Sequence, residues 1–120
     1  MREILFKAKA KDEPIEWAEG YLSKCEKEFI ICDEEGVVIF IDLETICQYT
    51  GLTDKNGNKI WENDVVKDTT INILGSVEYD EEYGMYVINE VDDGYQNFQE
   101  FWSCTEVIGN IFDNPELLSS

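Results

Sequence analysis

The chain has 120 residues, a net charge of −18 from 9 basic and 27 acidic residues, and no histidine. A chain of this length folds as one domain on the usual size prior, and its apolar content of 43% is too high for wholesale disorder. Without histidine it cannot supply a Ser-His-Asp triad, a Cys-His pair or a His-ligated zinc, and the acidic balance argues against direct binding to nucleic-acid phosphates.

The charge is unevenly distributed along the sequence. Residues 1–27 hold six basic and six acidic groups and are neutral, so the whole net charge lies in residues 28–120. From residue 68 onward there are twelve carboxylates and no lysine or arginine. We therefore expect the neutral N-terminal segment to pack against acidic surface of its own or a neighbouring subunit, because self-repulsion opposes contacts within the acidic part.

The N-terminus has no long apolar region of the secretory type, and the longest apolar run, residues 37–41, is too short to cross a membrane. We expect a soluble, cytoplasmic protein. The four cysteines, Cys25, Cys32, Cys47 and Cys104, match no paired C-x-x-C spacing. Free thiols are the expectation, and a four-thiolate metal site or a redox pair is the alternative.

The first third of the chain has the two-residue period of β-strands. Apolar residues alternate over 4–10 and again over 15–21, which predicts two half-buried strands. Residues 28–32 and 37–41 flank the polar turn Asp33–Gly36 and predict a hairpin. Because both hairpin strands are nearly all apolar, we expect both of their faces to be covered, by a barrel interior or by a partner.

The remainder is also rich in strand signals. Residues 42–53 are less regular, and the Asn-Gly pair within 54–59 predicts a tight turn. Strands follow over 60–67, over 69–79 with Gly75 as a bulge or bend, over 83–88 and over 105–112. An acidic loop is expected over 89–97, residues 98–103 are ambiguous, and Pro115 can begin a short terminal helix.

The fold class predicted from this pattern is mainly β, between all-β and α+β. The specific prediction is a small barrel-like or SH3-like antiparallel sheet with an N-terminal strand arm and a short C-terminal helix. Residues 1–120 are expected to form a single domain. Within it, residues 1–43 are the N-terminal strands and hairpin, and residues 44–120 are the barrel-like core with its C-terminal segment.

No group of residues defines a reaction. Asp54, Asn56 and Asn58 have the spacing of a calcium loop, but Lys59 and Val65 occupy the positions where such a loop needs glycine and glutamate. Acidic pairs are numerous, yet no spacing selects two of them for acid–base catalysis. We therefore predict no catalytic residue, no cofactor and no metal, and hence a protein that is not an enzyme; a carboxylate-based metal enzyme is a remote alternative.

Residues 44–67 resemble the signature of the YopX family of small phage and prophage proteins, through the run QYTGLTDKNGNKIWENDVV. The N-terminal residues 2–7 and the C-terminal residues 106–118 agree with the same family. Asn63 stands where the family pattern usually has glycine. The residues that carry the resemblance are Gln48, Tyr49, Thr50, Gly51, Asp54, Asn56, Gly57, Ile60, Trp61, Glu62, Asp64, Val65, Ile108, Gly109, Asn110 and Pro115.

The resemblance implies a phage or prophage origin, a mainly β fold and a homo-oligomer, but no activity. We expect the signature residues to be mainly structural, because turn chemistry accounts for most of them, with Glu62 and Asp64 bonding turn amides. The favoured hypothesis is a self-associating, non-catalytic protein that binds an unidentified host or phage protein. The alternative is an acidic nucleic-acid mimic that blocks a host DNA-binding or defence protein, with carboxylates replacing phosphates.

Overall fold

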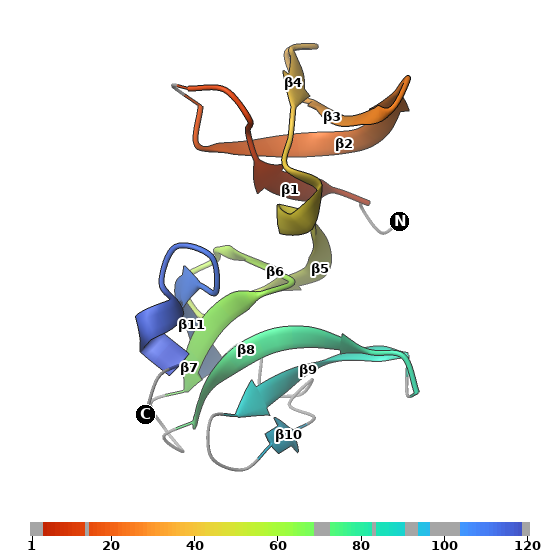
Figure 1. Cartoon of the computed structure of the whole chain (residues 1–120). Coiled ribbons are helices and arrows are strands. Elements are labelled where there is room, and N and C mark those ends of the chain that lie inside the picture. The colour runs from red at the N-terminus through yellow and green to blue at the C-terminus, as the bar shows by residue number, and fades with distance from the viewer. Residues whose placement is uncertain are drawn as a thin grey trace. The chain divides into compact units, whose positions relative to one another are not determined.

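The computed structural model describes residues 4–13, 15–68, 73–82, 84–90, 94–96 and 104–118, with the backbone only at 73, 90 and 94–96. The chain divides into two compact units, Met1–Tyr49 and Thr50–Ser120. Each unit is built on antiparallel strands (Figure 1). The mainly β prediction is confirmed.

Unit 1 holds the strands β4-β3-β2-β1-β5, in this order, of a six-stranded sheet that ends with β6. The register pairs Ala8 with Ala18 and Leu22 with Ile31, and these side chains face the core. A single bridge, Ala10 to Ile41, joins the end of β1 to the residue after β4. The elements of this unit are β1 (Phe6–Lys9), β2 (Trp17–Cys25), β3 (Glu28–Cys32), β4 (Val38–Phe40), the 3-10 turn η1 (Leu43–Thr45) and the start of β5 (Cys47–Thr53).

Unit 2 contains the end of β5 with its neighbour β6, and a five-stranded sheet in the order β10-β9-β8-β7-β11. Its core cluster gathers Ile60, Val66, Val77, Tyr86 and Ile88 from four different strands. The elements are β6 (Lys59–Trp61), β7 (Asp64–Asp68), β8 (Ile73–Asp80), β9 (Met85–Glu90), β10 (Gly94–Gln96), β11 (Thr105–Asn110) and the 3-10 turn η3 (Pro115–Leu118).

Several local predictions need correction. The sheets are open within the described ranges and form no closed barrel, and the C-terminal helix is only the 3-10 turn η3. The register runs without a shift through Gly75, and the bulge lies between Val107 and Gly109. Gly75 is instead required because a Cβ there would lie 2.4 Å from the backbone oxygen of Asn89.

Two segments were also misjudged in type. Residues 47–53, expected to be irregular, form β5, and the expected acidic loop over 89–97 contains the end of β9 and the short strand β10. In the Asn-Gly turn, Gly57 has a positive φ of 82°, whereas Asn56 is not among the residues with positive φ. The ambiguous residues 98–103 lie outside the described residues.

Candidate functional site

The signature segment places its residues on three strands and the turns between them. The described positions are β5 for Gln48, Tyr49, Thr50 and Gly51, the β5–β6 turn for Asp54, Asn56 and Gly57, β6 for Ile60 and Trp61, the β6–β7 turn for Glu62, and β7 for Asp64 and Val65. The C-terminal positions are β11 for Ile108, Gly109 and Asn110, and η3 for Pro115.

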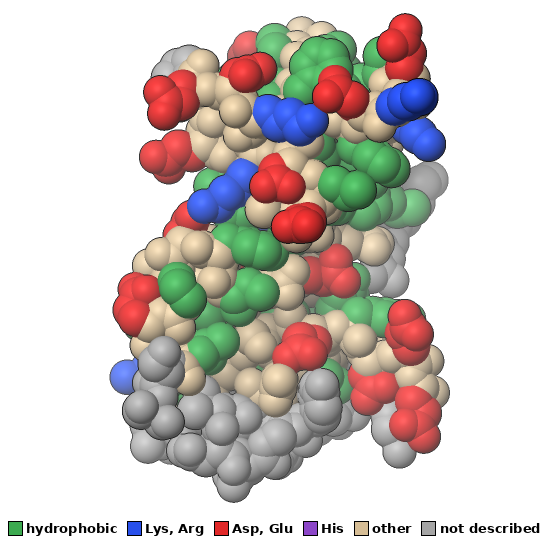
Figure 2. All heavy atoms as spheres, viewed as in Figure 1, with side chains coloured by type: hydrophobic (Ala, Val, Ile, Leu, Met, Phe, Trp, Pro, Cys, Tyr) green, Lys and Arg blue, Asp and Glu red, His purple; other side chains and the backbone are tan. Residues whose placement is uncertain are grey.

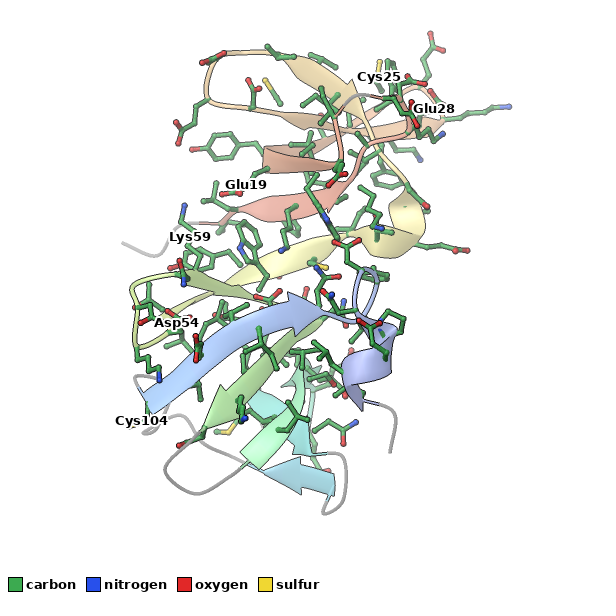
Figure 3. All side chains as sticks on the ribbon, turned by 90° about the vertical axis from the view of Figure 1, so that its left-hand side faces the viewer. Glu19, Cys25, Glu28, Asp54, Lys59 and Cys104 are labelled. Carbon is green, nitrogen blue, oxygen red and sulfur yellow. The ribbon has the colours of Figure 1, made fainter. Side chains whose placement is uncertain are left out.

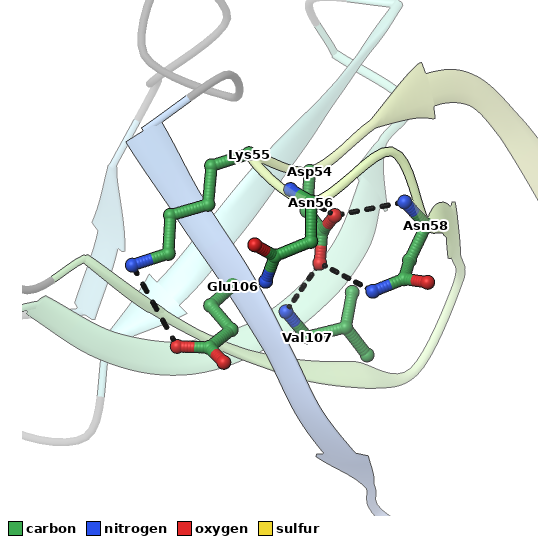
Figure 4. A network of polar contacts seen from close by, with 6 residues as sticks. All are labelled: Asp54, Lys55, Asn56, Asn58, Glu106 and Val107. Carbon is green, nitrogen blue, oxygen red and sulfur yellow. Dashed lines mark hydrogen bonds and ion pairs between the residues drawn. The ribbon is translucent and has the colours of Figure 1, made fainter.

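Asp54 is the centre of the first turn (Figure 4). One carboxylate oxygen, Oδ1, accepts hydrogen bonds from the backbone N–H groups of Asn56 and Asn58, both at 2.9 Å. The other, Oδ2, accepts from the side-chain amide of Asn58 at 3.3 Å and from the backbone N–H of Val107 at 3.0 Å. This carboxylate, only 4% exposed, therefore organises its own turn and also ties that turn to β11, 53 residues later.

Burial alone raises the pKa of Asp54, but the hydrogen bonds from Val107, Asn58 and Asn56 outweigh it and lower the pKa below its ordinary value. Asp54 is thus held as the carboxylate at neutral pH. A calcium ion that bound the Asp54 carboxylate would have to displace the N–H groups that already donate to it. The backbone N–H of Lys55 also donates to the carbonyl of Thr105, and the Lys55 and Glu106 side chains form an exposed ion pair beside the turn.

The second turn, between β6 and β7, is closed by Asp64. Its Oδ2 accepts from the backbone N–H of Trp61 at 2.8 Å, as expected for a turn-stabilising carboxylate. Asn63 has a left-handed φ of 69°, its N–H donates to Val77 and its C=O accepts from Ile111. The position where the family pattern has glycine therefore does adopt the backbone geometry that favours glycine, and asparagine adopts it more readily than most residues.

The C-terminal signature is a third turn. Asn110 Oδ1 accepts from the N–H groups of Phe112 and Asp113, and Asn114 Oδ1 accepts from the N–H of Asn110. A Cβ at Gly109 would lie 2.5 Å from Asn114 Oδ1, so only glycine fits there without a shift. The pairing of β7 with β11 sets Asn110 opposite Asp64. The central and C-terminal parts of the signature therefore form one structural unit, which sequence spacing could not have shown.

Across the described part of the chain, no three of the His, Cys, Asp and Glu side chains lie close enough together to hold a metal ion. The groups labelled in Figure 3 come from both units: Glu19, Cys25 and Glu28 belong to unit 1, and Asp54, Lys59 and Cys104 to unit 2. The four cysteines, all of them in the described residues, form no disulfide, and Cys25 and Cys104 are exposed.

A second feature, on unit 1, was not predicted. Side chains alternate across a strand, so the neighbours of core residue Ile31 point to the opposite face of the sheet. On that outer face the register aligns Tyr21, Cys32 and Val38 in one row and Ser23, Ile30 and Phe40 in the next. We call these six residues the outer patch.

Within this chain the outer patch is uncovered. Tyr21 is 63% exposed, Val38 53% and Phe40 40%, and Ile30 and Cys32 are half-buried. Figure 2 shows hydrophobic side chains at the surface over β2–β4, among acidic and basic ones. We expected both faces of the hairpin to be covered, by a barrel interior or by a partner. This chain leaves the outer face exposed, so the barrel interior is wrong and a partner is the alternative that remains.

The fold and the signature define the class of this protein: a small β protein of two units, in which the signature residues form turns and contacts between strands. The family model described as YopX protein matches residues 3–119. The chain belongs to the YopX family. A search of curated proteins found no match at the threshold applied.

The described residues include no helix with the length and apolar character needed to span a membrane.

Proposed function

We propose that this chain is a non-catalytic binding protein encoded by a phage or prophage, which self-associates and acts on a host or phage protein in the bacterial cytoplasm. The observation that carries the proposal is the outer patch. Large apolar side chains gathered on one exposed face are typical of interaction sites, since scattered single ones are what ordinary surfaces show. The signature residues support the same conclusion, because their polar groups bond to turns and strands.

The proposal is tested by affinity capture from host lysate with tagged wild-type protein and a Phe40→Glu variant. Phe40 is exposed on the edge strand, so the charge should not disturb the core. We expect a host or phage protein to be enriched on the wild type and lost with the variant. Equal enrichment on both, or enrichment of nothing, would contradict binding through this face.

Charge supports a second candidate, the nucleic-acid mimic. Unit 2 holds fifteen carboxylates and three lysines, a net charge of −12. Three of those carboxylates, Asp54, Asp64 and Asp68, are buried and cannot stand in for phosphates. The mimic therefore depends on the exposed acids that remain, such as Glu81, Glu82 and Glu116. Competition with duplex DNA for host DNA-binding proteins would support this function, and failure to compete would exclude it.

A further inference from the structure

We propose that the outer patch and the β3–β4 turn beside it form a docking site for a segment of another protein in which apolar side chains are flanked by lysine or arginine. This inference rests on the proposed function and names the chemistry of the host or phage protein that it invokes.

The outer patch supplies the apolar part of the site. Tyr21, Val38 and Phe40 are exposed. Ile30 and Cys32 of β3 lie between them in the register of the sheet. None of the six outer-patch residues is charged, so apolar side chains of a partner can cover the patch without burying an unpaired charge, which would be costly.

The β3–β4 turn supplies the charge. Oδ1 of Asp33 accepts hydrogen bonds from the backbone N–H groups of Glu35 at 3.0 Å and Val37 at 2.9 Å, which fixes the turn directly after the patch residue Cys32. Glu34 and Glu35 are exposed. Among the described residues, no lysine pairs with either of them. Two carboxylates beside the patch are therefore available to the cations of a partner.

The lysines of β1 are engaged elsewhere on the unit. The Nζ atoms of Lys7 and Lys9 lie 4.9 and 5.7 Å from the centroid of the Trp17 ring, within the range of a cation–π contact. Lys7 also lies opposite Glu19 in the register. Because β2 lies between β1 and the β3–β4 hairpin, these two lysines belong to the other side of the face.

The remaining described lysines of unit 1 lie toward the end of β3 that is opposite the acidic turn. Nζ of Lys11 lies 3.0 Å from Oε1 of Glu28, the first residue of β3. Lys24 lies near the end of β2 and Lys27 in the β2–β3 turn, which also precedes Glu28. The cations of the described part of unit 1 are thus placed away from the acidic turn.

The sign of the surrounding charge selects the partner. Residues 28–44, which contain the hairpin, hold six acidic residues and no lysine or arginine. Unit 1 as a whole holds six basic and twelve acidic residues, a net charge of −6. A second copy of this chain would bring the same acidic turn to the contact, whereas a cationic segment matches the sign of this surface. Complementary charge favours the cationic partner and disfavours partners of like charge.

The face of the sheet, rather than its edge, is the contact surface. The edge strand β4 has only three residues, and short edge strands offer little template for strand addition. The backbone N–H of Lys11 already donates to the carbonyl of Phe40 at 2.9 Å, so this acceptor of the edge is in use. We therefore expect partner side chains to pack on the outer patch, and no partner backbone to pair with β4.

The size of the site sets the expected strength. The patch and the turn together have far fewer residues than the roughly 20–30 on each side of a standard stable interface. We therefore expect a short segment to bind with a dissociation constant on the order of micromolar or weaker. Salt should weaken the complex, because it screens the attraction between the carboxylates of the turn and the cations of the partner.

The test begins with selection of short random peptides from a display library on the immobilised full-length protein, at about 50 mM NaCl. We expect the selected peptides to combine apolar residues with lysine or arginine. The strongest binder is then synthesised, together with a copy in which glutamine replaces every lysine and arginine. In fluorescence anisotropy the copy should bind ~10-fold or more weakly, and the original peptide should lose affinity several-fold at about 500 mM NaCl.

Charge variants test the acidic turn. Glu34→Gln combined with Glu35→Gln should weaken binding of the synthetic peptide by about 3-fold or more, since each exposed ion pair contributes modestly. The matched control is Glu81→Gln combined with Glu82→Gln, two exposed acids of the β8–β9 turn in unit 2, which should leave the affinity unchanged.

Apolar variants test the patch. Phe40→Ser and Tyr21→Ser, on different strands, should each weaken binding by ~10-fold or more, because each removes a large apolar contact without adding charge. The matched control is Ile108→Ser, an exposed aliphatic residue on β11 of unit 2, which should bind as wild type does. Circular dichroism checks that the variants are folded.

The outcomes separate the parts of the proposal. If the selected peptides are not enriched in lysine or arginine, or bind the Glu34→Gln, Glu35→Gln protein as tightly as wild type, the cationic character of the partner is overturned. If both patch variants bind as tightly as wild type, or selection yields no peptide, the docking site is overturned. The proposed function is judged separately, by capture of a host or phage protein on wild type and on Phe40→Glu, so the two can fail independently.

Discussion

Asp54 shows how one buried carboxylate can organise a turn and fasten it to a distant strand. Four N–H donors converge on its two oxygens, and hydrogen bonds to a charged acceptor are stronger than those between neutral groups. A neutral amide at this position would offer one acceptor oxygen and would point its own N–H groups at donors.

We therefore expect Asp54→Asn to lower the free energy of unfolding by about 2–4 kcal/mol, measured by urea denaturation at pH 7. Glu81→Gln is the matched control, because Glu81 is an exposed carboxylate in the β8–β9 turn, and it should change stability by less than about 0.5 kcal/mol. A small effect of Asp54→Asn, equal to that of the control, would show that the network does not stabilise the fold.

The lowered pKa of Asp54 also predicts a dependence on pH. Because the folded pKa lies below the unfolded one, the stabilisation is fully present above the unfolded value of about 4 and is lost as pH falls through the folded value. Wild type should therefore lose stability below about pH 4 more steeply than Asp54→Asn, which has no such carboxylate to protonate. Parallel pH profiles in urea denaturation would contradict this assignment.

Asn63 adopts a left-handed backbone that most side chains disfavour, while its backbone N–H and C=O bond to Val77 and Ile111. Glycine can keep both bonds without strain, so Asn63→Gly should stay within about 0.5 kcal/mol of wild type. Asn63→Ala should cost about 1–2 kcal/mol, because alanine lacks asparagine's tolerance of this geometry. Urea denaturation of the two variants side by side checks this, and equal stability of the two would refute the backbone explanation.

At the scale of elements, the close approach of β2 and β3 depends on Gly20. A Cβ there would lie 2.2 Å from the backbone oxygen of Cys32, which no real contact allows. Gly20→Ala should therefore force the strands apart and destabilise unit 1 by about 2 kcal/mol or more. Hydrogen exchange should quicken over β2 and β3 more than over β8 and β9, whereas Ser23→Ala, exposed on the same strand, should leave both rates nearly unchanged.

The elements with strict alternation could be predicted from the sequence. The two-residue period placed β1 correctly and the start of β2, which continues to Cys25, beyond the predicted 15–21. The β3–β4 hairpin lies where the two apolar runs around a polar turn placed it. β5 was missed because its residues from Gln48 to Gly51 mix polar and small side chains, and its pairing with β1 joins residues 40 or more positions apart. Such pairing is decided by tertiary contacts rather than local preference.

The candidate site was predictable only in part. The turn at 54–59 and the turn-bonding role of Asp64 follow from local chemistry. The bond from Val107 to Asp54 and the exposure of the outer patch do not, because both depend on which strands become neighbours. A nearly all-apolar strand looks the same in sequence whether its second face is covered by its own chain or by another.

For the whole molecule, the net charge of −18 must work against the folded state, because folding brings the carboxylates together. Raising NaCl from 0.05 to 0.5 M should increase the thermal midpoint by several degrees, because the screening length shortens severalfold. Glu81→Gln combined with Glu82→Gln, two exposed acids of one turn, should shrink this response. A midpoint that does not depend on salt, measured by calorimetry at low protein concentration, would contradict a repulsive contribution.

The bond between Asp54 and Val107 also has a consequence for the order in which the protein forms. Asp54 leaves the ribosome 53 residues before Val107 of β11. During that interval the carboxylate lacks the hydrogen bond from the backbone N–H of Val107. Contacts of such long sequence separation form late, since loop closure must precede them. During synthesis all residues of unit 1 are present once residue 49 has been made, whereas unit 2 is incomplete until its last strand, β11, has been made. The outer patch is therefore present on the growing chain well before the second unit is finished, so a partner that binds this face can do so during translation only if the patch is its site.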